Sequence, residues 1–294
     1  MAQTKIVRKG QGRRKRRRRA RMKKMLLVMV LLALLVTGIR LAGNLAAGFG
    51  NSGNGGEVSA PEKLEDSEVR QRLQQLAEQY EDYREIYEHM DEYPIKLLAA
   101  LCNNEEMLDF VKGYLDSDGS VTGGFSLLEL AEEHPVILQW DKRWGYAPYG
   151  DSDIGMAGCA PTCLSMVILQ LTKDSSATPD KVADYAMENG YYLEGTGTAW
   201  SLMTEGGIAF QVEGEEIPLD EGRIDQALSQ GHPVVLSLRP GDFTTEGHFI
   251  VLVEKQDGGY VVRDPNSRVR SQKLWDYGTL EPQIKNLWEF QRIS

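Results

Sequence analysis

The chain has 294 residues, of which 41% are hydrophobic, and this composition excludes a disordered or fibrous protein because it supplies at least one apolar core. Its net charge of −10 hides two unlike regions, since 13 of the 33 Lys and Arg residues lie between Lys5 and Lys24, whereas the first acidic residue is Glu57. The chain has three cysteines and no CxxC pair, so neither a disulfide framework nor a cysteine-based zinc site is predicted.

Residues 1–24 form a basic arm, and residues 25–47 are predicted to be a transmembrane signal anchor. The run from Met25 to Ile39 has no charged residue. It is shorter than the roughly 20 residues that a helix needs to cross a bilayer, but Arg40 can keep its charge at the interface while small residues after it extend the span. A cleaved signal peptide is the alternative, because small residues follow the apolar run, yet the basic arm is unusually long for one.

The basic arm also sets the expected topology. Lysine and arginine are retained on the cytoplasmic side of a membrane segment, so we expect the arm in the cytoplasm and the acidic remainder outside. This predicts a single-pass protein of the cell membrane, held by its N-terminal helix, with an extracytoplasmic folded domain. A basic arm can also bind nucleic acid, but anionic lipid headgroups explain it more simply beside a membrane segment, so no nucleic-acid partner is expected.

A flexible linker at 48–61, rich in Gly, Ser and Asn, precedes a helical spacer predicted at 62–134. From Glu62 to Tyr93, apolar residues recur at helical spacing among many acidic ones, which predicts one amphipathic helix ending near Pro94. Shorter helices are predicted at 94–102, 105–115 and 126–134. We expect the spacer to pack on, or lift, the domain behind it, and its acidic helix is a candidate surface for a protein partner.

Residues 135–294 are predicted to form a separate domain, in which short apolar runs alternate with helical segments. Capping residues predict one helix between Thr178 and Gly190 and another between Asp220 and Gly231. Strands are predicted at 233–238, 248–255 and 260–265, the last two joined by a turn around 257–259. Helices followed by antiparallel strands predict the α+β class.

Cys159 is the first candidate for chemistry. It precedes Pro161, a residue suited to a first helical turn, and the run 164–171 is apolar all round, so we predict a buried helix that begins at Cys159. The positive end of a helix favours the reactive thiolate over the thiol. The alternative is that Cys159 is a small core residue, as we interpret Cys163 and Cys102.

His248 is the second candidate, because it leads directly into the apolar run FIVLV and therefore lies at the rim of a buried strand. Asp264 ends the partner strand, and the turn at 257–259 brings it close to opposite His248, where a carboxylate can orient the imidazole. Asn266 is an alternative orienter, since amides also serve in this chemistry. A surface histidine and a turn aspartate remain the simpler interpretation of each residue alone.

Several motifs occur in a characteristic order, and together they resemble the papain-like cysteine peptidases of the stand-alone branch related to bacteriocin double-glycine leader peptidases. The motifs are LQWDKRWGYAPYG (138–150), GCAPTCLSM (158–166), GTGTAWSLMTEGG (195–207), PGDFTTEGHFIVL (240–252) and DPNS (264–267). The resemblance covers residue 138 to the C-terminus and implies a papain-like domain there. The membrane anchor and the helical spacer, which are predicted from the residues before it, precede this domain.

The resemblance implies a role for each site residue. Cys159 corresponds to the nucleophile, His248 to its base and Asp264 to the orienting acid. Gln139 corresponds to the oxyanion-hole residue, where a side-chain amide acts beside the backbone N–H of Cys159, and one such donor contributes roughly 3 kcal/mol to transition-state binding. The family usually has glycine after the nucleophile, where this chain has Ala160.

The expected function is therefore a membrane-anchored cysteine peptidase. It would hydrolyse peptide or isopeptide bonds of a peptide or protein substrate through a Cys-His-Asp triad at the outer face of a bacterial membrane. Neither a cofactor nor a metal is expected. The alternative is a catalytically silent, surface-tethered binding or scaffold protein with a papain-like fold.

Overall fold

The computed structural model describes residues 59–293. The basic arm predicted at 1–24, the signal anchor at 25–47 and most of the linker at 48–61 lie outside the described residues. Within 59–293, no helix is both long and apolar enough to span a bilayer. This part of the chain contains helices and antiparallel strands together, which agrees with the α+β class.

The α-helices, in chain order, are α2 (Asp66–Gln79), α3 (Arg84–Glu88), α4 (Ile95–Asn103), α5 (Leu108–Lys112), α6 (Leu127–Ala131), α7 (Ile154–Ala157), α8 (Cys159–Thr172), α9 (Pro179–Glu188), α10 (Ser201–Thr204), α11 (Glu221–Ser229), α12 (Arg268–Gln272) and α13 (Tyr277–Leu280). The strands are β1 (Pro148–Tyr149), β2 (Ser152–Asp153), β3 (Tyr192–Leu193), β4 (Gly197–Thr198), β5 (Val212–Glu216), β6 (Val234–Leu238), β7 (His248–Gln256), β8 (Gly259–Arg263), β9 (Leu274–Trp275) and β10 (Ile284–Arg292). Short 3-10 turns lie at Glu81–Tyr83, Met90–Glu92, Glu105–Met107, Gly206–Phe210 and Glu281–Gln283.

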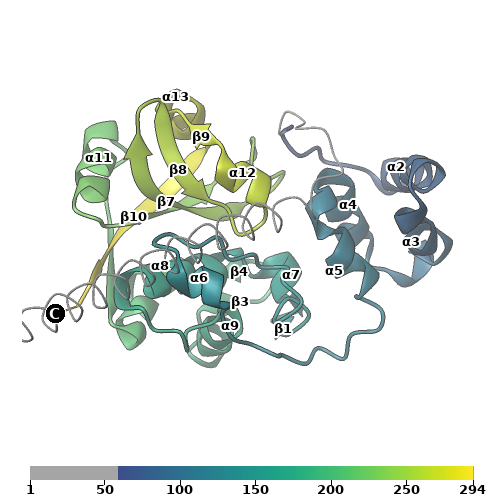
Figure 1. Ribbon diagram of the computed structural model, residues 1–294, viewed down its shortest axis with the longest axis horizontal. Coiled ribbons are helices and arrows are strands. Elements are labelled where there is room, and N and C mark those ends of the chain that lie inside the picture. Colours follow the sequence, from purple (N-terminus) through teal and green to yellow (C-terminus); the bar gives the residue numbers. More distant parts are fainter. Residues whose placement is uncertain (1–58, 294) are drawn as a thin grey trace, which may run out of the picture. The chain divides into compact units, whose positions relative to one another are not determined.

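An antiparallel sheet with the strand order β5-β10-β6-β7-β8-β9 organises the larger part of the fold. Successive residues of a strand face opposite sides of a sheet. Val235 and Val251 accordingly pack in the apolar cluster around α8, whereas Leu236 and Ile250 pack in the cluster that includes α11. The two helices lie on opposite sides of the sheet (Figure 1). Because both faces are covered, β6 and the first six residues of β7 are buried. The strands predicted at 233–238, 248–255 and 260–265 are confirmed, although β8 ends at Arg263, two residues earlier than predicted.

Helix α8 begins at Cys159, and its residues from Ala160 to Leu169 are all buried. Its start requires a glycine, since a Cβ at Gly158 would lie 2.5 Å from the carbonyl oxygen of Ile154. Its end is set by Lys173, which adopts the left-handed conformation with a φ of 59°. The predicted buried helix that begins at Cys159 is confirmed.

The single helix predicted from residue 62 to 93 is wrong. The chain leaves the helical conformation at Tyr80, which is extended with φ −127° and ψ 125°. Helix α3 packs against α2 beyond this point, so Leu73 of α2 and Ile86 of α3 are buried in the same core. Folding back removes from water an apolar stripe that one long helix would leave exposed. No Pro or Gly marks the break, and the sequence therefore gives no sign of it.

Helices α2 to α5, called here the helical segment (residues 66–112), form a core with part of the chain that follows. Leu138 and Trp140 are buried in the same apolar cluster as the helical segment. The ring of Phe110 in α5 lies so close to Gly155 that a Cβ there would approach its Cζ to 2.4 Å. The spacer therefore packs on the domain behind it. The boundary predicted between 62–134 and 135–294 stays a prediction.

Strands β5, β9 and β10 and helices α12 and α13 were not predicted from the sequence. Strand β10 lies between β5 and β6, although charged residues interrupt its apolar ones. One of them, Glu289, is buried because it pairs with Arg223 of α11 and with His232. A charged residue such as Glu289 interrupts the apolar pattern from which a buried strand is predicted, and its partners are known only from the folded structure.

Candidate active site

The thiol of Cys159 stands at the start of α8, where the first N–H groups of a helix have no partner inside it. Its side chain is partly exposed, whereas Cys163 is fully buried. Burial raises the pKa of the Cys163 thiol well above its usual range and raises the pKa of Cys102 to about 11. Burial therefore keeps both of these thiols in the unreactive protonated form at neutral pH, which leaves the partly exposed Cys159 as the candidate nucleophile.

His248 is the first residue of β7, paired with Leu238 at the end of β6. Its ring is buried, with 7% of the residue exposed, and Nε2 lies 2.7 Å from Oδ1 of Asp264. Since Nε2 is engaged by the carboxylate, Nδ1 is the nitrogen left to interact with the thiol of Cys159. The side chain of Cys159 also acts on the imidazole, so the predicted nucleophile and the predicted orienting acid are both neighbours of the histidine.

The environment of His248 favours its charged form. Burial on its own lowers the pKa of the imidazole, because it disfavours the cation, but the Asp264 carboxylate and the side chain of Cys159 raise the pKa to about 9. The ring consequently keeps two protons at neutral pH. Such a group stabilises a neighbouring thiolate and can protonate a leaving amine.

Asp264 follows β8 and is completely buried. Besides the contact with His248, its Oδ1 accepts a hydrogen bond of 2.8 Å from the backbone N–H of Asn266. Its own N–H donates to Oγ of Ser271 at 2.9 Å. Of the two orienters left open by the sequence, the structure places the carboxylate of Asp264 on the imidazole, while Asn266 takes part through its backbone.

Gln139 is buried beside the segment that leads into α8. Its Nε2 donates one hydrogen bond of 2.8 Å to the carbonyl of Gly155, and its backbone N–H donates to the carbonyl of Pro265 at 2.8 Å. One amide hydrogen of Nε2 is thus used to fix the side chain, while Oε1 is buried without a hydrogen-bond partner among the described residues. The structure brings Gln139 to both the Cys159 and the Asp264 segments.

Arg270, in α12, is a site residue that the sequence did not reveal. Its Nη1 lies 3.6 Å from Oδ2 of Asp264, and only 3% of the residue is exposed. The sequence around it, SRVRSQK, is polar and resembles a surface turn. Ser267, which caps α12, is the one feature of the sequence that could have indicated a helix here. In a helix, Arg268 and Arg270 point to different sides, so one of them can be buried while the other is exposed.

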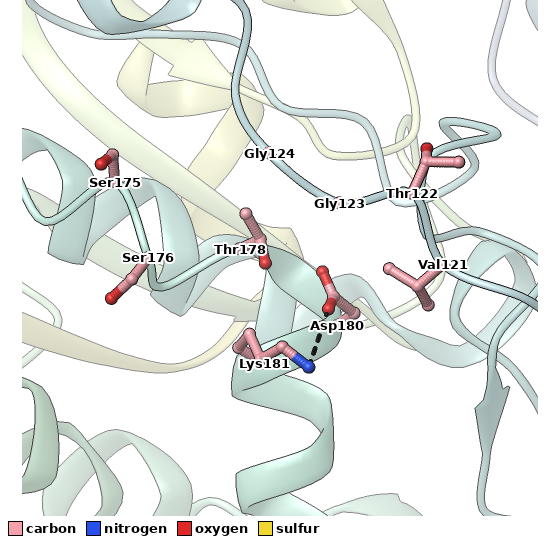
Figure 2. Close-up of a pocket in the computed structure, with 9 residues that line it drawn as sticks. All are labelled: Val121, Thr122, Gly123, Gly124, Ser175, Ser176, Thr178, Asp180 and Lys181. Atoms are coloured by element: carbon pink, nitrogen blue, oxygen red, sulfur yellow. Dashed lines mark ion pairs between the residues drawn. The ribbon is translucent and has the colours of Figure 1, made fainter.

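A separate cavity of about 320 Å³ lies near the start of α9 (Figure 2). The residues that line it are Val121, Thr122, Gly123, Gly124, Ser175, Ser176, Thr178, Asp180 and Lys181. Asp180 is buried and its Oδ2 lies 3.4 Å from Nζ of Lys181. Since none of the four predicted site residues lines this cavity, it is distinct from the Cys159 site. Across residues 59–293, no group of three or more His, Cys, Asp and Glu side chains is arranged to hold a metal ion.

The site can be compared with known proteins. A model of the Peptidase_C39 like family matches residues 131–292. This stretch contains Gln139, Cys159, His248 and Asp264, whereas the helical segment lies before it. No curated protein and no solved structure matches the chain.

Proposed function

We propose that this chain, because it belongs to the Peptidase_C39 like family, acts as a cysteine peptidase with Cys159 as its nucleophile. The observation that best supports the proposal is the contact of 2.7 Å between Nε2 of His248 and Asp264, which leaves Nδ1 for the thiol. An imidazole fixed in this way is a base for the thiol and later an acid for the leaving group.

In the proposed reaction, His248 already carries the proton of the Cys159 thiol, and the Cys159 thiolate attacks the carbonyl carbon of a peptide or isopeptide bond. The free amide hydrogen of Gln139 and the N–H of Cys159 stabilise the oxyanion. The C–N bond then breaks, and His248 gives its proton to the departing amine. Water next attacks the thioester while His248 accepts a proton, the C–S bond breaks, and the acid product and the free thiol are formed.

The proposal includes a location at the outer face of a bacterial membrane, with residues 25–47 as a single-pass anchor. It is supported by the basic arm at 1–24 followed by an uncharged apolar run. The measurement is protease treatment of intact cells that lack an outer barrier: an anchored domain is digested from outside while residues 1–24 stay protected. A mature N-terminus near residue 48 would instead identify a cleaved signal peptide.

The activity is tested with a peptide-based, thiol-reactive probe on the purified full chain. We expect the wild type and Cys102→Ala to be labelled, and Cys159→Ala to remain unlabelled. Equal labelling of the wild type and Cys159→Ala would reject the proposal. The alternative of a catalytically silent scaffold predicts that the wild type is labelled no better than Cys159→Ala.

A further inference from the structure

We propose that the helical segment (residues 66–112) is a working part of the catalytic centre, in which Glu106 and Asn104 position the loop of Asp264. This inference rests on the proposed cysteine peptidase function and assigns to it residues that precede the family match at 131–292. Glu106 and Asn104 touch none of the reacting groups. They are positioning residues, which act through the loop 264–268 and through α12.

Glu106 holds the start of α12 with both carboxylate oxygens. The hydroxyl of Ser267 donates to Oε1, and the backbone N–H of Arg268 donates to Oε2 at 2.8 Å. The N–H of Val269 lies 3.4 Å from Oε1. These N–H groups belong to the first turn of a helix and have no partner within it, so a carboxylate is the acceptor that binds them best. Glu106 is only partly exposed, whereas its neighbour Glu105 is exposed.

Asn104 holds the same loop two residues earlier. Its Nδ2 donates a hydrogen bond of 2.6 Å to the backbone carbonyl of Asn266. That carbonyl also accepts from Nε1 of Trp140 at 3.0 Å. The N–H of Asn266 binds Oδ1 of Asp264, so holding the carbonyl of the same residue restricts its backbone and, through the N–H, the carboxylate that orients His248.

Gln139 is held by the same segment. Its two neighbours, Leu138 and Trp140, are buried in the core of the helical segment. Its amide donates to the carbonyl of Gly155, a residue that packs against the ring of Phe110 in α5. The helical segment therefore holds both the predicted oxyanion donor and the orienting acid, although these come from distant parts of the chain.

Helix α12 completes the connection. The turn that Glu106 caps carries Arg270, and the guanidinium of Arg270 faces Oδ2 of Asp264 at 3.6 Å. Displacing the first turn of α12 moves this cation away from the carboxylate. The helical segment thus controls both the position of Asp264 and the charge beside it.

The test uses the purified full chain and the double variant Asn104→Ala/Glu106→Gln, with Glu105→Gln as the matched control. The readout is the rate at which iodoacetamide alkylates Cys159 between pH 5 and 10, followed by mass spectrometry so that Cys102 and Cys163 are counted separately. We expect the double variant to react about 10 to 100 times more slowly near pH 7, since small displacements of catalytic groups cost factors of this size. Its pH profile should move to higher pH, while Glu105→Gln follows the wild type.

Thermal unfolding of the same samples separates positioning from loss of the fold. The proposal requires the double variant to remain folded at the assay temperature and still to lose reactivity. It is overturned if the double variant alkylates like the wild type at every pH, or if reactivity falls only in samples that have unfolded. The assay needs no peptide substrate: a wild type that alkylates readily but hydrolyses no peptide rejects the proposed function and leaves the positioning role standing.

Discussion

Oδ2 of Asp264 faces Nη1 of Arg270 at 3.6 Å, and both side chains are buried behind the histidine. Removing one partner of a buried ion pair leaves the other charge without compensation, which costs roughly 3 kcal/mol or more. We expect Arg270→Gln to lower the free energy of unfolding by about this amount, measured by urea denaturation. Arg268→Gln, on the exposed side of the same helix, is the control and should change stability by less than about 0.5 kcal/mol.

The contact between Asp264 and His248 predicts which residue orients the imidazole. Asp264→Asn should reduce kcat by roughly 10³- to 10⁴-fold, because an amide can favour the wrong tautomer of the histidine. Asn266→Ala should retain most activity, since Asn266 serves the site through its backbone N–H and carbonyl. The reverse order of kcat values in steady-state kinetics would assign the orienting role to Asn266.

If Gln139 stabilises the oxyanion, its removal should lower kcat and leave KM nearly unchanged. The loss of one oxyanion donor raises the barrier by roughly 3 kcal/mol, so Gln139→Ala should lower kcat by about 100-fold or more. KM should change little, because the oxyanion exists only in the transition state and the tetrahedral intermediate. A variant whose defect lies mainly in KM would place Gln139 in substrate binding instead.

The pKa of His248 predicts how stability depends on pH. The pKa is about 9 in the folded chain and about 6.5 in an unfolded one, so the folded state binds this proton more tightly. The resulting stabilisation, on the order of 3 kcal/mol, is complete below pH 6.5 and is lost as the pH rises through 9. Comparing the wild type with His248→Gln by urea unfolding at pH 6 and pH 9.5 isolates it: the difference in stability should shrink at the higher pH.

The contact between Phe110 and Gly155 predicts a steric effect. A Cβ at Gly155 would lie 2.4 Å from the ring, so Gly155→Ala should cost about 1 to 3 kcal/mol of stability. Replacing the ring by a smaller side chain, in Phe110→Leu, should relieve part of this clash. A double-mutant cycle is the measurement, and strictly additive losses would show that the two residues do not compete for the same space.

Local patterns in the sequence were sufficient for part of the fold. The hairpin of β7 and β8 was predicted because its strands are apolar runs separated by Gly258-Gly259, both with positive φ, at 103° and 150°. Helix α8 was predicted because Pro161 marks its first turn and most of the residues that follow it are apolar. Each of these signals lies within a few residues of the element that it specifies.

Contacts between distant residues produced no such signal. Glu106 and Ser267 are separated by 161 positions, and nothing distinguishes Glu106 from Glu105 in the sequence. The break at Tyr80 likewise depends on the tertiary packing of Ile86 against α2, which overrides a helical pattern without Pro or Gly. Arg270 was missed for the same reason, since its partner is fixed only by the fold.

The position of β10 has a consequence for biosynthesis. Strand β5 joins the sheet only through β10, and Trp288 and Phe290 of β10 belong to the core that surrounds α8. During synthesis, the core around residues 159–172 cannot be completed until residues 284–292 have been added to the chain. A nascent chain therefore holds the thiol of Cys159 on an incompletely packed helix, and the proposed site is completed only after residues 284–292 have been made.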